Sequence, residues 1–202
     1  MNSLQDVSRE TTARLEIFAA LLLRWNRTVN LIARRDEPDL WSRHIADSLQ
    51  LAPLIPPGAR HGIDLGTGGG FPGLVLAIAT NISFELVEAD NRKAAFLREA
   101  GRATNAQVQV LAIRAEAATL DPAPLITSRA LAPLSCLLAL SAPILAPGGI
   151  CLFLKGVAVE AELTAAAAEW HMQLQRVPSQ TAPCACILRI SDIARVHNNA
   201  RS

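Results

Sequence analysis

The sequence predicts an α/β protein with a doubly wound, mostly parallel sheet, an antiparallel last strand and an N-terminal helical extension. From Ile63 onward, short apolar β-type segments alternate with helical segments, which is typical of a parallel sheet covered by helices on both faces. Near the C-terminus, two β-type segments are joined by a loop too short for a crossover helix. They must therefore pair antiparallel.

Length and composition limit the number of domains. The chain has 202 residues, of which 50% are hydrophobic, enough for one domain with a core and hardly for two. We divide it into a helical extension at residues 1–58, a sheet-containing core at residues 59–194 and a flexible tail at residues 195–202. The net charge of +1 neither requires nor excludes a nucleic-acid partner. Without an evident signal peptide or segment of transmembrane length, we expect a cytoplasmic protein, and we expect a monomer.

Two helices are predicted in the extension. Apolar residues recur at helical spacing over residues 5–26, which predicts the first helix. The second is predicted over residues 37–51, with Asp36 as its cap and Pro38 in its first turn. Prolines and a glycine within residues 53–58 then end it and form the linker to the core.

The core is predicted to contain seven strands and four helices. Strands are expected at residues 63–65, 84–88, 108–112, 125–127, 150–154, 172–177 and 184–190. Helices are expected from residue 72 onward and at residues 91–104, 134–145 and 159–170.

A glycine-rich segment at residues 63–73 (Ile-Asp-Leu-Gly-Thr-Gly-Gly-Gly-Phe-Pro-Gly) directly follows a strand. Glycines there let the backbone approach a ligand closely. Asp64 stands where nicotinamide enzymes carry an apolar residue, and its carboxylate would repel a pyrophosphate but suit an ammonium and a sulfonium. Glu88, about 20 residues after the loop, is placed to accept ribose hydroxyls. The segment therefore predicts an S-adenosylmethionine site that Asp64 and Glu88 contact.

An ordered set of short motifs resembles the bacterial 16S rRNA guanine-N7 methyltransferases (RsmG, formerly GidB) over about residues 22–156. Its most specific part is an Arg-His-x-x-Asp-Ser block that precedes the Gly-Thr-Gly-x-Gly-x-Pro-Gly loop. The motifs are Trp25-Asn26-Arg27, Asn30-Leu31, Arg34-Arg35-Asp36, Arg43-His44-Ile45-Ala46-Asp47-Ser48, residues 64–73, Arg129-Ala130 and Leu154-Lys155-Gly156.

The resemblance implies a class I methyltransferase fold and methylation of N7 of a guanosine in the decoding-region loop of 16S rRNA, with the rRNA or the small ribosomal subunit as partner. Together with the glycine-loop interpretation, it gives an expected set of cofactor-binding residues: Asp64, Gly66, Gly68, Phe71, Glu88, Ala115, Glu116 and Arg129. The chain departs from the family pattern at residues 182–186 (Ala-Pro-Cys-Ala-Cys), where a basic residue is expected at the start of the last strand.

Basic residues are candidates for an RNA-facing surface beside the cofactor site. A solvated helix face is the alternative, because Asp36, Glu37 and Asp39 dilute the cluster. The predicted RNA-binding residues are Arg24, Arg27, Arg34, Arg35, Arg43, Arg92 and Lys93.

No catalytic base is predicted, because guanine N7 is a free lone pair with no proton to remove. Arg129, at the end of a strand, is expected to position either the cofactor or the guanine. His44, Asp47 and Ser48 form either a polar group over the active site or a bland arrangement in which Asp47 pairs with Arg43 and Ser48 faces solvent.

Other function classes fit the sequence less well. Asp64 argues against an oxidoreductase, and residues 127–130 (Thr-Ser-Arg-Ala) lack the Asn-Pro-Pro-aromatic run of adenine amino methyltransferases. A class I methyltransferase that acts on a small molecule or a protein is the remaining alternative. No metal is expected, since the four cysteines lack the spacing of a zinc site.

Overall fold

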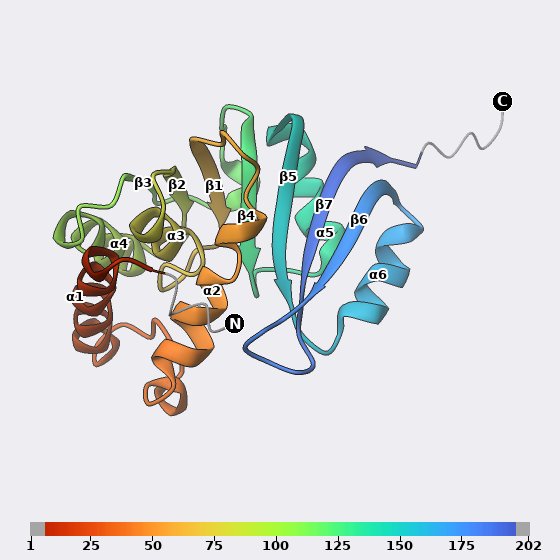
Figure 1. Cartoon of the computed structure of the whole chain (residues 1–202). Helices are drawn as coiled ribbons and strands as arrows, with labels where there is room; N and C mark the ends of the chain where they lie inside the picture. Colours follow the sequence, from red (N-terminus) through yellow and green to blue (C-terminus); the bar gives the residue numbers. More distant parts are fainter. Residues whose placement is uncertain (1–6, 197–202) are drawn as a thin grey trace, which may run out of the picture.

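The structure, a computed structural model, describes residues 7–196, in which a seven-stranded sheet carries helices on both faces (Figure 1). Along the sheet the strands follow the order β3-β2-β1-β4-β5-β7-β6. They are β1 His61–Leu65, β2 Ser83–Val87, β3 Val108–Leu111, β4 Ala123–Arg129, β5 Leu145–Lys155, β6 Trp170–Pro178 and β7 Cys186–Arg195.

Six α-helices and five short helical turns accompany these strands within the described residues. The α-helices are α1 Arg9–Asn26, α2 Ala46–Leu49, α3 Gly73–Ala79, α4 Asn91–Ala103, α5 Leu134–Ser141 and α6 Val159–Ala167. The short turns are η1 Arg34–Asp36, η2 Trp41–Ile45, η3 Ala52–Leu54, η4 Ala115–Ala117 and η5 Ala142–Ile144. In that part of the chain, no helix is long and apolar enough to cross a membrane.

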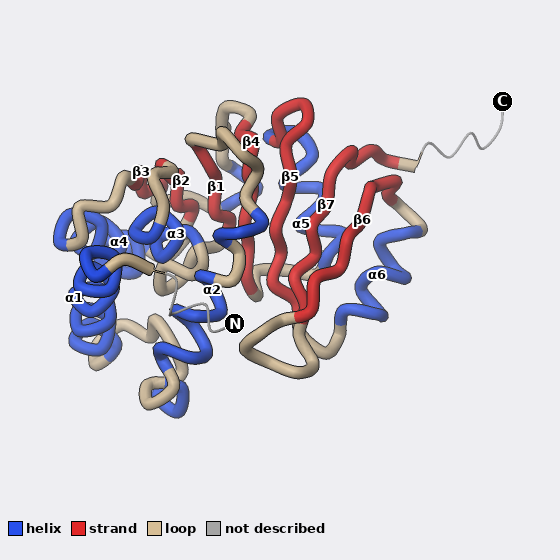
Figure 2. The backbone as a smooth tube through the Cα atoms, viewed as in Figure 1, coloured by secondary structure: helices blue, strands red, loops and turns tan. Residues whose placement is uncertain are grey.

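Strand pairing confirms the predicted topology. β1 pairs in parallel with β2 and β4, β2 with β3, and β4 with β5. β7 lies between β5 and β6 (Figure 2), and its pairing with both is antiparallel. The parallel registers align the last residues of neighbouring strands, so the loops that follow β1, β2, β3 and β4 meet at one edge of the sheet.

Two hydrophobic layers cover the sheet, one on each face. Successive strand side chains point to opposite faces, so Leu86 packs in the layer beneath α1, α3 and α4, while Val87 packs in the layer beneath α5 and α6. In β5, Leu152 likewise packs in the first of these layers and Phe153 in the second. Burial on both sides explains why these strands read as continuous apolar runs.

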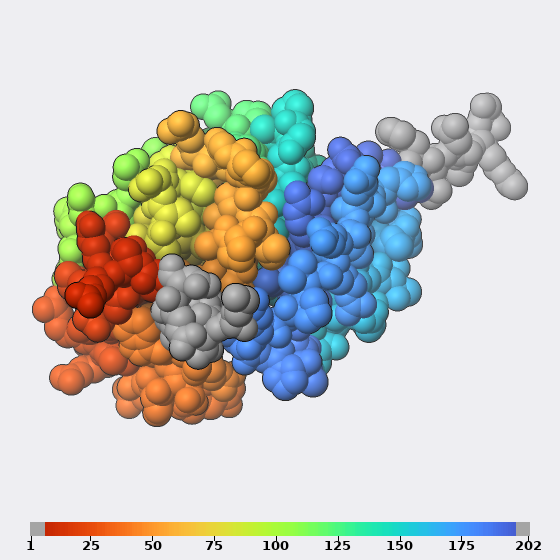
Figure 3. Space-filling model, in the orientation of Figure 1, coloured from red at the N-terminus to blue at the C-terminus, as the bar shows by residue number. Residues whose placement is uncertain are grey.

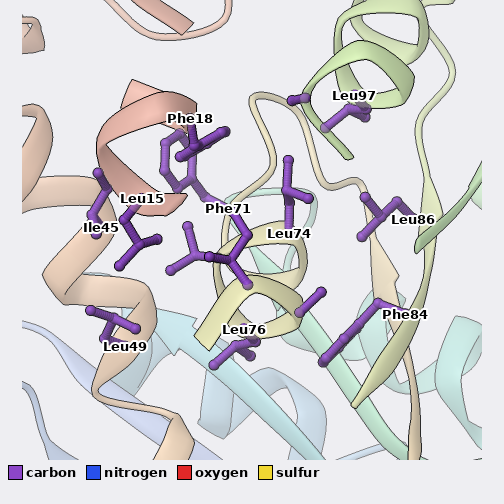
Figure 4. Packing of buried hydrophobic residues seen from close by; sticks show 14 of the residues in the cluster. Leu15, Phe18, Ile45, Leu49, Phe71, Leu74, Leu76, Phe84, Leu86 and Leu97 are labelled. Carbon is purple, nitrogen blue, oxygen red and sulfur yellow. The ribbon is translucent and has the colours of Figure 1, made fainter. Parts of the chain in front are cut away.

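The N-terminal extension packs on the first of these layers. Ser8 caps α1 by accepting from the Thr11 amide, and α1 buries Leu15 and Phe18 completely. Phe18 packs edge-on against Phe71 with ring centroids 5.5 Å apart (Figure 4), which joins the extension to the segment after β1. In the space-filling view, the orange surface around α2 adjoins the blue surface of the last two strands (Figure 3).

The predicted helix over residues 37–51 is only partly formed. The chain first makes the turn η1, and continuous helix begins at Trp41 in η2 and continues into α2. Asp36 does not cap a helix; its carboxylate lies 3.2 Å from the Arg43 guanidinium. A tertiary ion pair therefore replaces the expected local bond.

Several other boundaries differ from the prediction; for example, α5 ends at Ser141 and β5 already begins at Leu145, the last residue of the expected helix 134–145. Helix α6 ends at Ala167, and Trp170 already begins β6 with its ring buried under the second layer. Strand β4 extends through Arg129, longer than the expected 125–127. At the C-terminus, Arg195 still belongs to β7, and the rest of the predicted tail, from residue 197, lies outside the described residues, as does the beginning of the predicted first helix.

Candidate active site

A cavity of about 420 Å³ opens where the parallel strands end. Its walls come from the loops after four strands: the glycine loop after β1, Glu88 after β2, residues 113–116 after β3, and Arg129 at the end of β4 with the two residues that follow it. Leu31, Ile32 and His44 of the extension complete it. This edge is where open α/β sheets bind ligands, and the volume is that of a small-molecule site.

The glycine loop is shaped by its contacts. Gly66 and Gly68 adopt positive φ, +67° and +57°. A Cβ on Gly66 would lie 2.5 Å from a Leu131 methyl, whereas a Cβ on Gly68 would meet only a backbone oxygen at 3.9 Å. Gly68 thus leaves open space in a wall of the cavity.

The structure shows a structural role for Asp64, whose contact with the cofactor stays a prediction. Its side chain is fully buried beneath the loop and is absent from the cavity wall. Oδ2 accepts a hydrogen bond from the Gly73 amide at 2.9 Å, and Oδ1 accepts one from the Thr127 hydroxyl at 2.7 Å. Asp64 therefore links the start of α3 to the neighbouring strand β4.

Burial and hydrogen bonding act in opposite directions on this carboxyl group. Burial raises the pKa of Asp64 to about 6, against the opposing effect of the hydrogen bonds from Thr127 and Gly73. Only glycine fits at position 73, because a Cβ there would lie 2.5 Å from the Asp64 Cβ. The acid and this glycine of the motif are therefore a structural pair.

Glu88 lies in the cavity wall, as the sequence predicts. Its Oε2 accepts from the Gly68 amide at 2.9 Å and its Oε1 from the Asp90 amide at 2.8 Å. These two bonds fix the carboxylate, and each oxygen keeps a lone pair for a ligand hydroxyl. The expected residues Ala115 and Glu116, in η4, also line the cavity.

Arg129 is held by the extension. Its Nη2 donates to His44 Nδ1 at 2.7 Å, and its Nη1 donates to the Arg43 carbonyl at 3.2 Å and to Asp47 Oδ2 at 3.4 Å. The guanidinium also lies 4.9 Å from the centroid of the Phe71 ring. A residue at the end of β4 is thus oriented by groups more than eighty positions earlier in the chain.

His44 is a neutral acceptor in this arrangement. Burial and, to a smaller extent, the positive charge of Arg129 lower its pKa to about 4. Because a guanidinium only donates, Nδ1 is the acceptor and the ring proton is on Nε2. Of the polar group predicted over the site, His44 and Asp47 are brought to Arg129, whereas Ser48 is buried and donates to the His44 carbonyl.

A second cavity, of about 680 Å³, adjoins the first. The two share His44, Arg129, Ala130 and Leu131. The remaining walls of the second come from Arg43, Asp47, residues 132–133, residues 154–156, Glu162 and residues 181–185 without Cys184. We call this second space the acceptor cavity.

The structure separates the predicted RNA-binding residues into groups. Lys93 lines the first cavity and Arg43 the acceptor cavity. Arg34 and Arg35, both exposed, follow the cavity residues Leu31 and Ile32 closely in sequence. Arg27 is also exposed, Arg24 pairs with Glu99 of α4 at 2.7 Å, and Arg92 lies 3.4 Å from Asp90.

Sequence reasoning missed a buried ion pair at the same edge. Lys155, at the end of β5, is 7% exposed and donates to Glu162 Oε2 at 2.7 Å and to the Ala132 carbonyl at 2.9 Å. A signal was present: Lys155 is a lone cation that ends an apolar strand, as Arg129 does one strand away.

A family comparison matches most of the chain. The model of "rRNA small subunit methyltransferase G" matches residues 11–186. Curated relatives named "Ribosomal RNA small subunit methyltransferase G" include one from Gluconobacter oxydans (strain 621H), 56% identical over 94% of this chain and 98% of the relative. Another, from Acidiphilium cryptum (strain JF-5), is 56% identical over 94% of each chain.

Solved methyltransferase structures share the fold at low sequence identity. The ribosomal protein L11 methylase of Lactobacillus delbrueckii subsp. bulgaricus has a TM-score of 0.60 and 15% identity, covering 74% of this chain and 78% of its own. The N-methyltransferase NodS of Bradyrhizobium japonicum WM9 has a TM-score of 0.54 and 16% identity, covering 77% and 97%. These similarities confirm the predicted class I methyltransferase fold.

Proposed function

Because the chain belongs to the rRNA small subunit methyltransferase G family, we propose that it transfers a methyl group from S-adenosylmethionine to N7 of a guanosine in the decoding-region loop of 16S rRNA. The family membership confirms the resemblance found in the sequence. The observation that carries the proposal is the cavity at the ends of the parallel strands, built from the family's glycine loop and Arg129. We further propose that the protein acts as a monomer in the cytoplasm, where small ribosomal subunits are found.

The residues of the first cavity fit S-adenosylmethionine. Glu88 presents a fixed carboxylate for the ribose hydroxyls, and the open side of Gly68 leaves room for a ligand against the backbone. Glu116, Ala115 and Ile113 supply a partly apolar edge for an adenine ring. The bound cofactor would supply an electrophilic methyl group.

The methyl transfer requires no general acid or base from the protein. The new bond takes its electron pair from N7, and the broken sulfur–carbon bond leaves its pair on sulfur, so no proton changes place. The contribution of the residues is therefore to orient the reactants and exclude water, which is worth several kcal/mol in such reactions. A small-molecule or protein acceptor is not favoured by the family relationship.

The direct test is to map N7-methylguanosine in 16S rRNA from cells with and without the gene, and to repeat the methylation with purified protein and small subunits. One guanosine in the decoding-region loop should lose its methyl group in the deletion strain and regain it in vitro. Unchanged methylation in the deletion strain would refute the proposal.

Activity is expected to show no ionisation of an enzyme base between about pH 6 and 9, since N7 loses no proton. His44 stays neutral over this range, because burial and Arg129 lower its pKa to about 4. The pH profile of kcat/KM for small subunits measures this. A loss of activity below pH 7 that disappears in His44→Asn would instead reveal a general base.

Glu88→Ala is expected to weaken cofactor binding about 10- to 150-fold, because a hydrogen bond to a charged group contributes about 1.5–3 kcal/mol. Isothermal titration calorimetry with S-adenosylmethionine measures the change. Glu85→Ala is the matched control: it removes the same group from β2, outside the cavity wall. Equal affinity of the Glu88 variant and wild type for S-adenosylmethionine would show that Glu88 does not bind the cofactor.

Reversal of Arg34 and Arg35 to Glu is expected to lower methylation about 10-fold or more at physiological salt, with little change in cofactor affinity. Each lost phosphate contact should flatten the slope of log K against log salt by about one. Binding of small subunits over a salt series measures the slope. Reversal of Arg176 in β6 and Arg195 in β7, which pair with Glu160 and Glu169, makes the same charge change as a control. Normal methylation at every salt concentration would place the RNA surface elsewhere.

A further inference from the structure

We propose that the acceptor cavity receives the target guanine turned out of its RNA stack, with the Glu162 carboxylate reading the Watson–Crick edge of the base. This inference rests on the proposed function and adds to it the place and the reading of the acceptor base. Its first support is position. The acceptor cavity shares Arg129, His44 and two backbone positions with the first cavity, so a base in it can present one edge to the methyl donor. A base inside a stack cannot enter the cavity.

The shape of guanine determines which wall meets which edge. N7 must face the first cavity, and the neighbouring O6 acceptor then lies beside the shared wall. Arg129 is in that wall, and its Nε and one Nη2 hydrogen have no hydrogen-bond partner within residues 7–196. The donors N1–H and N2–H₂ then point to the opposite side, toward the walls that only the acceptor cavity has.

Glu162 of α6 is an acceptor on that side, and it is held in place before any ligand arrives. Its Oε2 accepts from the Leu134 amide at 2.8 Å and from Lys155 Nζ at 2.7 Å. Its Oε1 has no hydrogen-bond partner among the described residues, although the side chain is only 22% exposed. A carboxylate oxygen fixed in a cavity wall suits the N–H donors of guanine and not the acceptor N1 of adenine.

The charged groups of the acceptor cavity are paired with one another: Glu162 lies 2.7 Å from Lys155, and Asp47 lies 3.4 Å from Arg129. Arg43, with a side chain 58% exposed, belongs to the same cavity and can meet the phosphates of the RNA outside it. Residues 182, 183 and 185, where the family pattern predicts a basic residue, are instead small or apolar and leave the cavity open.

Filling the cavity tests whether the base enters it. A Cβ on Gly156 meets no atom within 4 Å, so Gly156→Phe places its ring in open space, and Gly156 does not line the cofactor cavity. We expect kcat/KM for small subunits to fall at least about 100-fold with an unchanged Kd for S-adenosylmethionine. Val157→Phe, at a neighbouring position 82% exposed and outside the cavity wall, is the control and should behave as wild type.

A second measurement does not depend on catalysis. Small subunits reconstituted with 2-aminopurine at the target position should become more fluorescent when wild-type protein or Val157→Phe is added without cofactor, because the base leaves its stack. Gly156→Phe should give no increase. Normal methylation or a normal fluorescence increase with Gly156→Phe overturns the assignment of the cavity.

Reading by Glu162 is tested with the conservative variant Glu162→Gln, which keeps an oxygen for Leu134 and Lys155. Wild type should methylate subunits with inosine at the target, which lacks the 2-amino group, about 10- to 100-fold less efficiently than subunits with guanosine. Glu162→Gln should discriminate less than 3-fold, whereas Glu160→Gln on the same helix should discriminate as wild type. Equal discrimination by wild type and Glu162→Gln refutes the reading. A wild type inactive on guanosine would overturn the proposed function itself and this inference with it.

Discussion

Replacement of Arg129 by Lys is expected to lower kcat/KM for small subunits at least about 100-fold, despite the retained charge. The guanidinium donates to three acceptors from the extension and lies over the Phe71 ring. An ammonium on a flexible stem cannot reproduce that fork of donors or the stacking. Misplacement by about 1 Å near a transfer site can cost about 100-fold in rate.

Steady-state methylation of small subunits measures the loss, and calorimetry with S-adenosylmethionine separates it from cofactor binding. Arg189→Lys, at a half-buried position of β7 away from both cavities, is the matched control and should remain active. An Arg129→Lys protein with wild-type kcat/KM would show that only the charge matters, and the positioning role would be abandoned.

Asp64→Ala is expected to destabilise the fold by about 2–4 kcal/mol, because it leaves the Gly73 amide and the Thr127 hydroxyl buried without their acceptor. Asp64→Asn should cost much less, since its amide can accept from Gly73 and donate to Thr127. Urea denaturation followed by circular dichroism measures both. A stable Asp64→Ala protein that binds no cofactor would restore the direct contact predicted from the sequence.

The same carboxyl group gives stability a pH dependence of known sign. The pKa of Asp64 is raised from 3.8 in the unfolded chain to about 6 in the fold by burial. Between these values the folded state holds the proton and the unfolded state does not, so stability falls as pH rises from about 4 to 6. The shift corresponds to about 3 kcal/mol. Asp64→Asn should remove this part of the pH dependence, and identical pH profiles for the two proteins would contradict it.

The sheet could be predicted from the sequence because its strands are buried on both faces and separated by helices. Such strands give short apolar runs, and a pair of them without a crossover helix can only be antiparallel. The start of the helix within residues 37–51 was harder to predict, and Asp36, expected as its cap, pairs instead with Arg43. A propensity pattern carries no information on partners that meet only after folding.

Some residues of the candidate site could be placed from the sequence, and others could not. Glu88 follows a strand directly, and the topology alone brings it to the ligand edge. Asp64 belongs to the same motif, but the side of the strand on which its carboxylate lies depends on the approach of α3 at Gly73. The hydrogen-bond acceptors of Arg129 could not be predicted from the sequence, because they belong to the extension and no spacing rule relates them to β4.

The anchoring of Arg129 has a consequence for how such a protein can be rebuilt. Solved methyltransferase structures share the core that carries the glycine loop. The extension precedes the first strand of that core in the chain. Yet the extension supplies every acceptor that orients the guanidinium within the described residues, so the two parts are not interchangeable modules. A chimera that grafts a different recognition segment onto this core would inherit a cofactor site with an unanchored arginine. In this chain, a change of the extension would therefore alter the position of Arg129 together with the choice of substrate.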